Sequence, residues 1–244
     1  MNKKLINYLS LFLITIGFSV SLIHPSYSKP LNLTCAKRAL IDYYHDLAPE
    51  SEYIKDVNQV VIAAESYLNS RVIKNDHAAD PEKLAMVLDI DDTSLTNFPA
   101  NKEDGFGDSP VMIDARYHAA NAPAIAPVMR LYQEAISKKV SVFFITARKP
   151  LDTKPTEDLR SYTIDNLQKV GYMGWAGLYM PQGEDLKLSS SSYKTKIRKM
   201  LTENGYTIIL NLGDQDSDLV GGYAERGYKI PNPIYSTSAS PCDS

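Results

Sequence analysis

Two groups of aspartates in this chain each stand at the end of a run of apolar residues. The first group follows AMVL in the stretch AMVLDIDDTS and comprises Asp89, Asp91 and Asp92. The second follows TIILNLG and comprises Asp214, Asp216 and Asp218. Carboxylates gathered in this way raise one another's pKa, which is unfavourable unless a cation or a reaction requires them there. Because Mg²⁺ takes oxygen ligands and needs only one or two carboxylates, the two groups together predict a divalent-cation site.

The same residues and a few others offer the groups that phosphoryl transfer needs. A bound phosphate ester requires a nucleophile in line, a proton donor for the leaving alkoxide and positive charge on the remaining oxygens. Asp89 is the candidate nucleophile, and Asp91 can protonate the leaving group and then activate a water. Thr146, at the end of VSVFFIT, offers a hydroxyl, and Ala147 offers a neighbouring N–H group. Lys194 supplies the cation.

Short apolar runs that alternate with helical segments must position these side chains. The runs have the character of buried strands and cover 85–90, 140–146, 177–180 and 207–213. The helical segments between them cover 123–139, 156–171 with Thr156 as N-cap, and 193–205 closed by Gly205. This alternation predicts an α/β fold with a parallel sheet and helices on both faces. Since ligands bind beyond the carboxyl ends of such strands, both aspartate groups are expected at one edge of the sheet.

Two further segments flank the first acidic group. The segment 34–80 is predicted to be a helical extension, because its pattern is helical from 35 to about 74 and its apolar face suits packing on the core. Ser51 is a fitting N-cap within it. A small helical cap is predicted at about 97–122, since the stretch before the second strand is too short for a large cap domain. Because such a cap is small, we expect an open site that accepts varied substrates.

The first 28 residues have the order of a secretory signal peptide. Two lysines precede an apolar run, and a small-x-small tripeptide ends at Ser28. An uncleaved anchor is the alternative, because the run is nearly long enough to span a bilayer. The signal peptide is the preferred interpretation because the apolar run contains polar residues. Residues 29–244 are therefore expected to form one exported domain, periplasmic or secreted, without a stable membrane anchor.

Composition limits the partners and the other metals. Without the leader, 24 basic side chains remain against 29 acidic ones, so a surface for nucleic acid is not expected. The four histidines lack metal-ligand spacing, which disfavours zinc. The stretch from Asp214 imitates an EF-hand calcium loop, but Leu219 stands where that loop needs glycine. Cys35 and Cys242, the two cysteines, can form a disulfide in an oxidising compartment or remain free thiols.

Four motifs occur in order along the chain, namely DIDDT, FFITAR, Lys194 and GDQDSD. They resemble the ordered motifs of the haloacid dehalogenase superfamily phosphatases. The leader, the helical extension and the tail GYKIPNPIY are similar to those of its secreted acid phosphatases. That subfamily includes plant vegetative storage proteins and bacterial outer-membrane lipoprotein phosphatases. The resemblance runs from about residue 34 to 238.

The resemblance implies a Rossmann-like core and hydrolysis of small phosphomonoesters, with nucleotides among the candidates. It further implies an aspartyl-phosphate at Asp89 and a Mg²⁺ ion held by the Asp89 carboxylate, the Asp91 backbone carbonyl and the Asp214 carboxylate. Asp218 is then a ligand or a hydrogen-bonding partner of the site. Some storage proteins lack the first aspartate, so the presence of Asp89 favours activity.

Alternatives remain at this point. The chain can be a storage or binding protein with little catalysis, or a phosphotransferase that uses alcohol acceptors. Arg148 either orients the site or pairs on the surface, whereas Arg198, among the basic residues after Lys194, is expected on the surface. The aromatic side chains Phe98, Phe106 and Tyr117 suit the interior of the cap better than a stack on the substrate.

Overall fold

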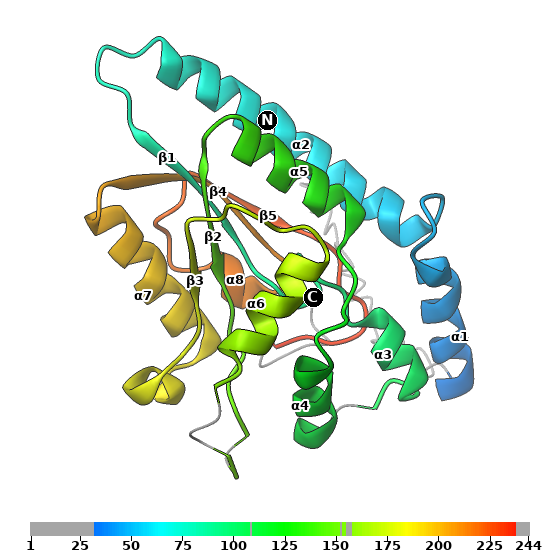
Figure 1. Ribbon diagram of the computed structural model, residues 1–244. Helices are drawn as coiled ribbons and strands as arrows, with labels where there is room; N and C mark the ends of the chain where they lie inside the picture. Colours follow the sequence, from blue (N-terminus) through cyan, green and yellow to red (C-terminus); the bar gives the residue numbers. More distant parts are fainter. Residues whose placement is uncertain (1–31, 108, 152, 155–157, 238–244) are drawn as a thin grey trace, which may run out of the picture. The chain divides into compact units, whose positions relative to one another are not determined.

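Five parallel strands form the sheet that carries the site (Figure 1). The computed structural model describes residues 32–107, 109–151, 153–154 and 158–237. Its strands are β1 (Lys83–Leu88), β2 (Ser141–Ile145), β3 (Gly177–Tyr179), β4 (Tyr206–Gly213) and β5 (Arg226–Lys229). Their order in the sheet is β3-β2-β1-β4-β5, and every pairing is parallel. The four strands expected from apolar runs are therefore present, and β5 is additional.

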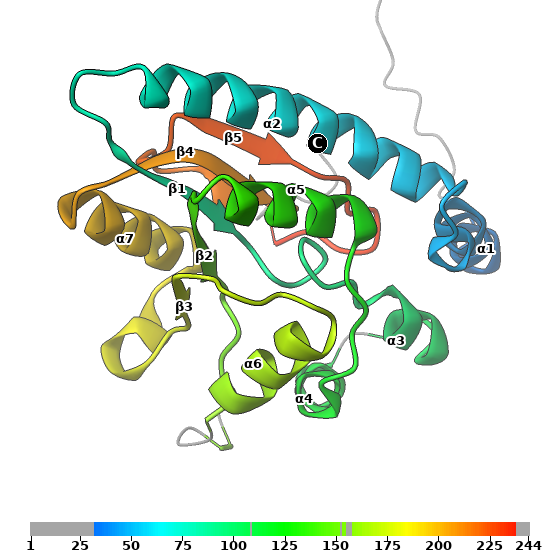
Figure 2. The same cartoon turned by 45° about the horizontal axis from the view of Figure 1, so that its top comes forward.

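The two faces of the sheet follow from the alternation of side chains along its strands. Ala85 and Val87 of β1 pack in one cluster with Tyr193, Ile197 and Leu201 of helix α7 (Ser190–Glu203). Met86 and Leu88 belong to the other cluster, which includes buried residues of α2 (Glu52–Asp76) and α5 (Ala126–Ser137). Figure 2 shows α2 and α5 lying side by side. Both faces are thus covered, as the continuous apolar strands required.

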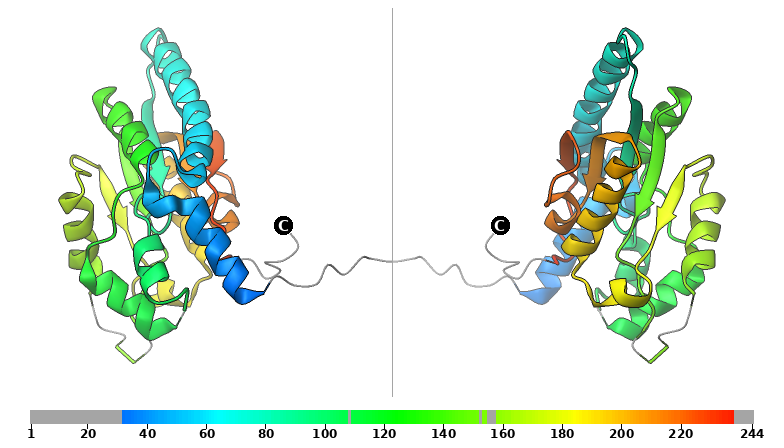
Figure 3. Two further views of the ribbon diagram at one scale, coloured as in Figure 1. Left: turned by 90° about the vertical axis from the view of Figure 1, so that its right-hand side faces the viewer. Right: turned by 90° about the vertical axis from the view of Figure 1, so that its left-hand side faces the viewer.

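The helical extension is divided into two helices. Helix α1 (Leu33–Tyr44) leads into a short 3₁₀ turn, η1 (His45–Leu47), before α2 begins. Three consecutive residues of this turn have positive φ, at 38°, 48° and 64°, which ends α1 and lets α2 start in a new direction (Figures 1 and 3). Ser51 caps α2, because its hydroxyl accepts the N–H of Ile54 at 3.2 Å. The predicted N-cap is confirmed.

The segment expected to form a cap contains two short helices, α3 (Phe98–Glu103) and α4 (Pro110–Ala119). Both lie beyond the carboxyl ends of β1 and β2 (Figure 1). Together with the sheet, they confirm the expected class, an α/β fold of Rossmann-like type with a small helical cap.

The remaining helical elements are α6 (Arg160–Lys169), the 3₁₀ turn η2 (Gly183–Lys187) and α8 (Asp216–Leu219). The sequence placed the start of α6 too early, since its N-cap is Leu159 and Thr156 lies outside the described residues. Among the described residues, no helix combines the length and apolarity needed to cross a bilayer. The predicted leader 1–28 and Cys242 lie outside the described residues, so cleavage and the disulfide stay predictions.

Candidate active site

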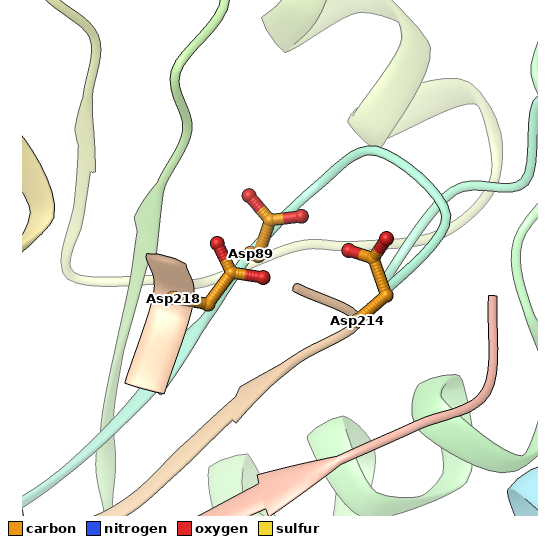
Figure 4. Close-up of side chains that lie close together, drawn as sticks. All are labelled: Asp89, Asp214 and Asp218. Carbon is orange, nitrogen blue, oxygen red and sulfur yellow. The ribbon is translucent and has the colours of Figure 1, made fainter. Parts of the chain in front are cut away.

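The two aspartate groups meet because β1 and β4 are neighbours in the sheet. Asp89 follows β1 directly, and its N–H donates to the carbonyl of Leu212 in β4 at 3.0 Å. Asp214 follows β4 directly. With Asp218 of α8, these residues form what we call the carboxylate cluster, in which one oxygen of each side chain lies within 4.8 Å of the others (Figure 4). All three side chains are buried.

A glycine and a tight turn explain the spacing of Asp214 and Asp218. A Cβ on Gly213 would lie 2.3 Å from the Cβ of Asp218, so only glycine lets β4 pass beneath this carboxylate. The N–H of Gln215 donates to Asp218 Oδ2 at 2.9 Å and closes a capping box around α8. Asp216 instead points outward and pairs with Lys229 at 2.7 Å. The alternating residues Asp214, Asp216 and Asp218 therefore do not point at one common ion, as they would in an EF-hand loop.

Lys194 is the cation of the carboxylate cluster. It lies in the second turn of α7, a helix that Ser189 caps by accepting the N–H of Ser192. Its Nζ contacts Asp89 Oδ1 and lies 2.5 Å from Asp218 Oδ1. Only 4% of the lysine is exposed. The cluster therefore holds three buried carboxylates and one ammonium group, which contacts two of them.

Burial and neighbouring charges shift the pKa values of this cluster. Burial, followed by the charge of Asp218, raises the pKa of Asp214 to about 6. Burial also raises the pKa of Asp89, against the opposing effect of Lys194. Burial alone would lower the pKa of Lys194, but its two carboxylate partners raise it. Hard oxygen donors with uncompensated charge are what a divalent cation requires, so the donor set fits such an ion.

Three polar groups surround Asp214. Thr93 donates to one carboxylate oxygen at 3.0 Å, and the amides of Gln215 and Asn232 donate to the other at 2.6 and 2.7 Å. Sequence reasoning missed Asn232, although the residue lies in the tail GYKIPNPIY that carried part of the resemblance. Its amide orients a candidate ligand, as hydrogen bonds around metal sites commonly do.

Asp91 has its own cation. The guanidinium of Arg148 forms two parallel hydrogen bonds to its carboxylate, each 2.9 Å long, and Asn97 adds a third at 3.0 Å. Burial would raise the pKa of Asp91, but Arg148 outweighs it and the pKa is lowered. Arg148 is 3% exposed and is also bonded to Thr163 at 3.2 Å. It therefore holds the Asp91 carboxylate and does not pair on the surface.

Thr146 and Ala147 lie at the same edge of the sheet. The pairing of Leu88 with Phe144 places Thr146 just past the end of the β1–β2 ladder. Its N–H extends the β2–β3 ladder by donating to the carbonyl of Tyr179 at 3.1 Å, and its Oγ1 accepts the N–H of Arg148 at 3.1 Å. The Thr146 hydroxyl can still donate its own proton. Ala147 lines a cavity of about 380 Å³ that extends to α4.

The cap aromatics divide into two groups. Phe98 is buried and stacks on Tyr44 at 4.2 Å between centroids, so it belongs to the interior as expected. Tyr117 lies 4.5 Å from the guanidinium carbon of Arg148. Together with Phe106, Tyr117 lines a cavity of about 140 Å³ that also reaches Asp91. These two aromatic side chains therefore border the site.

One expectation for α7 is wrong. Arg198 is not on the surface but fully buried, with 0% of its area exposed. Three of its acceptors are backbone carbonyl oxygens of α8 and the loop after it, which no local pattern on α7 reveals. Among the basic residues that follow Lys194 on this helix, Lys196 and Lys199 are exposed, as expected.

The chain is similar to known proteins. A family model described as HAD superfamily, subfamily IIIB (acid phosphatase), matches residues 30–238. Acid phosphatase 1 of Solanum lycopersicum is 30% identical over 198 residues, which cover 80% of this chain and 73% of that protein. Vegetative storage protein 2 of Arabidopsis thaliana is 30% identical over 200 residues, which cover 80% and 70%.

Solved structures agree on the fold. The class C acid phosphatase from Bacillus anthracis superposes with a TM-score of 0.63 at 22% identity, covering 84% of this chain and 87% of that one. A second structure of the same enzyme has tungstate bound. The family match spans the sheet, the cap and all four motifs. This chain therefore belongs to the acid phosphatases of subfamily IIIB of the haloacid dehalogenase (HAD) superfamily.

Proposed function

We propose that the chain hydrolyses phosphomonoesters through an aspartyl-phosphate formed on Asp89. The observation that carries the proposal is the carboxylate cluster at the carboxyl ends of β1 and β4, with Lys194 in contact with two of its members. Membership of an acid phosphatase family supports the same reaction. Tungstate is a tetrahedral oxyanion like phosphate, and its binding by a structural relative is consistent with a phosphate site.

The chain's residues divide the reaction between them. A carboxylate oxygen of Asp89 attacks phosphorus as the bond to the leaving oxygen breaks, and Asp91 gives that oxygen a proton. Asp91 then takes a proton from the water that hydrolyses the acyl phosphate. Lys194, the Thr146 hydroxyl and the Ala147 N–H bind the phosphoryl oxygens. Arg148 keeps the Asp91 carboxylate in one orientation throughout.

The cation that fits the donor set is Mg²⁺. The Asp89 carboxylate, the Asp91 backbone carbonyl and the Asp214 carboxylate would hold it, with Asp218 as a further ligand or a hydrogen-bonding partner. When bound, the ion offsets the negative charge of the cluster and the phosphate, which lets the two approach each other. The small cap, with cavities of about 140 and 380 Å³ beside Asp91 and Ala147, suits small esters, nucleotides among them.

The place of action is proposed from the leader. A signal peptide at 1–28 would deliver the chain to the periplasm or the exterior, where phosphate is released from organic esters. The net negative charge disfavours nucleic acid as a partner.

Replacing the nucleophile tests the proposal. Asp89→Asn should lower kcat on an aryl phosphate in Mg²⁺ by about 10³-fold or more, since the amide cannot attack phosphorus. Acid quenching of the wild type during turnover should recover phosphate bound covalently to the protein. Asp216→Asn is the matched control, because this aspartate faces solvent beside Lys229 and should keep full activity. Unchanged turnover in Asp89→Asn would rule out the mechanism.

A storage protein with little catalysis is the second candidate. Its support is the similarity to vegetative storage protein 2, which equals the similarity to acid phosphatase 1 in identity. One assay with and without EDTA separates the two, since only a phosphatase gives a cation-dependent release of phosphate. Adding glycerol to the same assay reveals any transfer to an alcohol acceptor.

A further inference from the structure

Arg198 makes an unusual set of contacts for a fully buried arginine. Its Nη1 donates to the carbonyl of Asp218 at 2.6 Å, its Nε to that of Gly222 at 2.9 Å, and its Nη2 to that of Val220. No carboxylate of the described residues forms an ion pair with it, since all these acceptors are backbone oxygens. Burying a guanidinium is costly unless its hydrogen bonds are satisfied, so this set of carbonyls requires an explanation.

The three carbonyls belong to the end of α8 and the loop after it. With four residues, α8 is too short to be stable by itself, and the carbonyls at its end have no partners within the helix. The loop is pressed close to α7, because a Cβ on Gly221 would lie 2.1 Å from Thr195 Oγ1. Arg198 therefore supplies the donors that this helix end lacks.

Helix α7 thereby contacts both the side chain and the backbone of Asp218. Lys194 and Arg198 are four residues apart and lie on the same side of α7. Lys194 contacts the Asp218 carboxylate, and Arg198 bonds the backbone carbonyl of the same residue. We propose that Arg198 is a positioning residue that acts through Asp218 and fixes this carboxylate in the divalent-cation site. The inference rests on the cation site of the proposed function.

An arginine suits this task better than a lysine would. Its planar fork offers five N–H donors in fixed directions, whereas a lysine ammonium offers three on a flexible stem. Arg198→Lys should therefore keep the charge but lose the simultaneous hydrogen bonds to three carbonyl oxygens. The fold should persist, because Asn211 also donates to the Asp218 carbonyl, at 2.8 Å.

The test is Mg²⁺ binding to the mature chain, measured by calorimetry without substrate. Arg198→Lys should raise the Kd for Mg²⁺ by about 10-fold or more, the usual cost of losing a partner behind a ligand. Lys199→Met is the control on the same helix, since this exposed lysine pairs with Glu203 away from Asp218, and the Kd should not change. In the background of Asp218→Asn, the effect of Arg198→Lys on Kd should shrink to less than about 2-fold, because the residue through which it acts is already altered.

The outcomes are distinguishable. If Arg198→Lys lowers resistance to urea but leaves Kd unchanged, the arginine is only structural and the inference is overturned. If its effect persists in full beside Asp218→Asn, the arginine does not act through Asp218. If the wild type binds no Mg²⁺, the proposed cation site falls and this inference with it. Should Arg198→Lys not fold, Thr195→Val, which removes one hydrogen bond to the guanidinium, should raise Kd by about threefold.

Discussion

Two groups of ion-paired aspartates lie at the carboxyl edge of the sheet, and they differ in the number of acids for each cation. At Asp91, one carboxylate meets one guanidinium through two 2.9 Å hydrogen bonds, and the pKa of the acid is lowered. At the carboxylate cluster, the ammonium of Lys194 contacts two of three acids, and burial together with like charges raises the pKa of Asp89 and Asp214. The charges of the Asp91–Arg148 pair balance, whereas the carboxylate cluster has more negative than positive charge.

The difference indicates where a cation belongs. A carboxylate matched by a bidentate arginine has little to gain from a metal ion, so the Asp91 side chain is not expected to bind one. Three carboxylates and one ammonium leave two formal negative charges, which a divalent ion offsets. The charge balance of each region thus agrees with a different role. Changing the cation of each region should separate those roles.

The largest effect is expected from Lys194→Met, because this change leaves the carboxylate cluster without its cation. Activity should fall by about 10³-fold, and the free energy of unfolding by about 3–5 kcal/mol, the usual cost of breaking a buried pair. Added Mg²⁺ should restore part of that stability. Urea unfolding with and without Mg²⁺ measures this effect, and Lys196→Met on the exposed side of α7 is the control. Equal stability of the two variants would contradict the assignment of Lys194 as the cation of the carboxylate cluster.

A smaller effect is expected from Arg148→Met, which leaves Asp91 without its guanidinium. The value of kcat should fall by about 10²-fold, since the proton donor is no longer oriented. The Kd for Mg²⁺ should stay within about 2-fold, because no hydrogen bond joins Arg148 to the side chains of the carboxylate cluster. Steady-state kinetics and calorimetry check the two parts, with the exposed Arg130→Met as control. A large rise in Kd would show that the two regions are not independent.

The smallest effect is expected from Asn232→Ala, which removes one of the hydrogen bonds to Asp214. The Kd for Mg²⁺ should rise by about 10-fold, while kcat at saturating Mg²⁺ stays within about 2-fold, since the nucleophile and the proton donor are untouched. Titration of activity against Mg²⁺ gives both numbers. A fall in kcat that excess Mg²⁺ does not restore would contradict this assignment.

Much of the fold was predictable because strand signals are local. The four apolar runs became β1 to β4, and the acidic residues at the ends of β1 and β4 had to meet once those strands were neighbours. Strand β5 was missed, because RGYK at the sheet edge is mostly exposed and has no apolar run. The division at η1 depends on three residues in a left-handed conformation, which no periodicity reveals.

By itself, the sequence determined the order of the motifs, the buried strands and the carboxylates placed at their ends. Only the tertiary structure decided which cation serves which acid, since Arg148 and Asp91 are separated by 57 positions and Lys194 and Asp89 by 105. It also decided that Arg198 is buried and that Asn232 turns to Asp214. The physical reason is that the charge and length of a side chain depend on its own residue type. Its partner depends on which distant segments the folded sheet brings together.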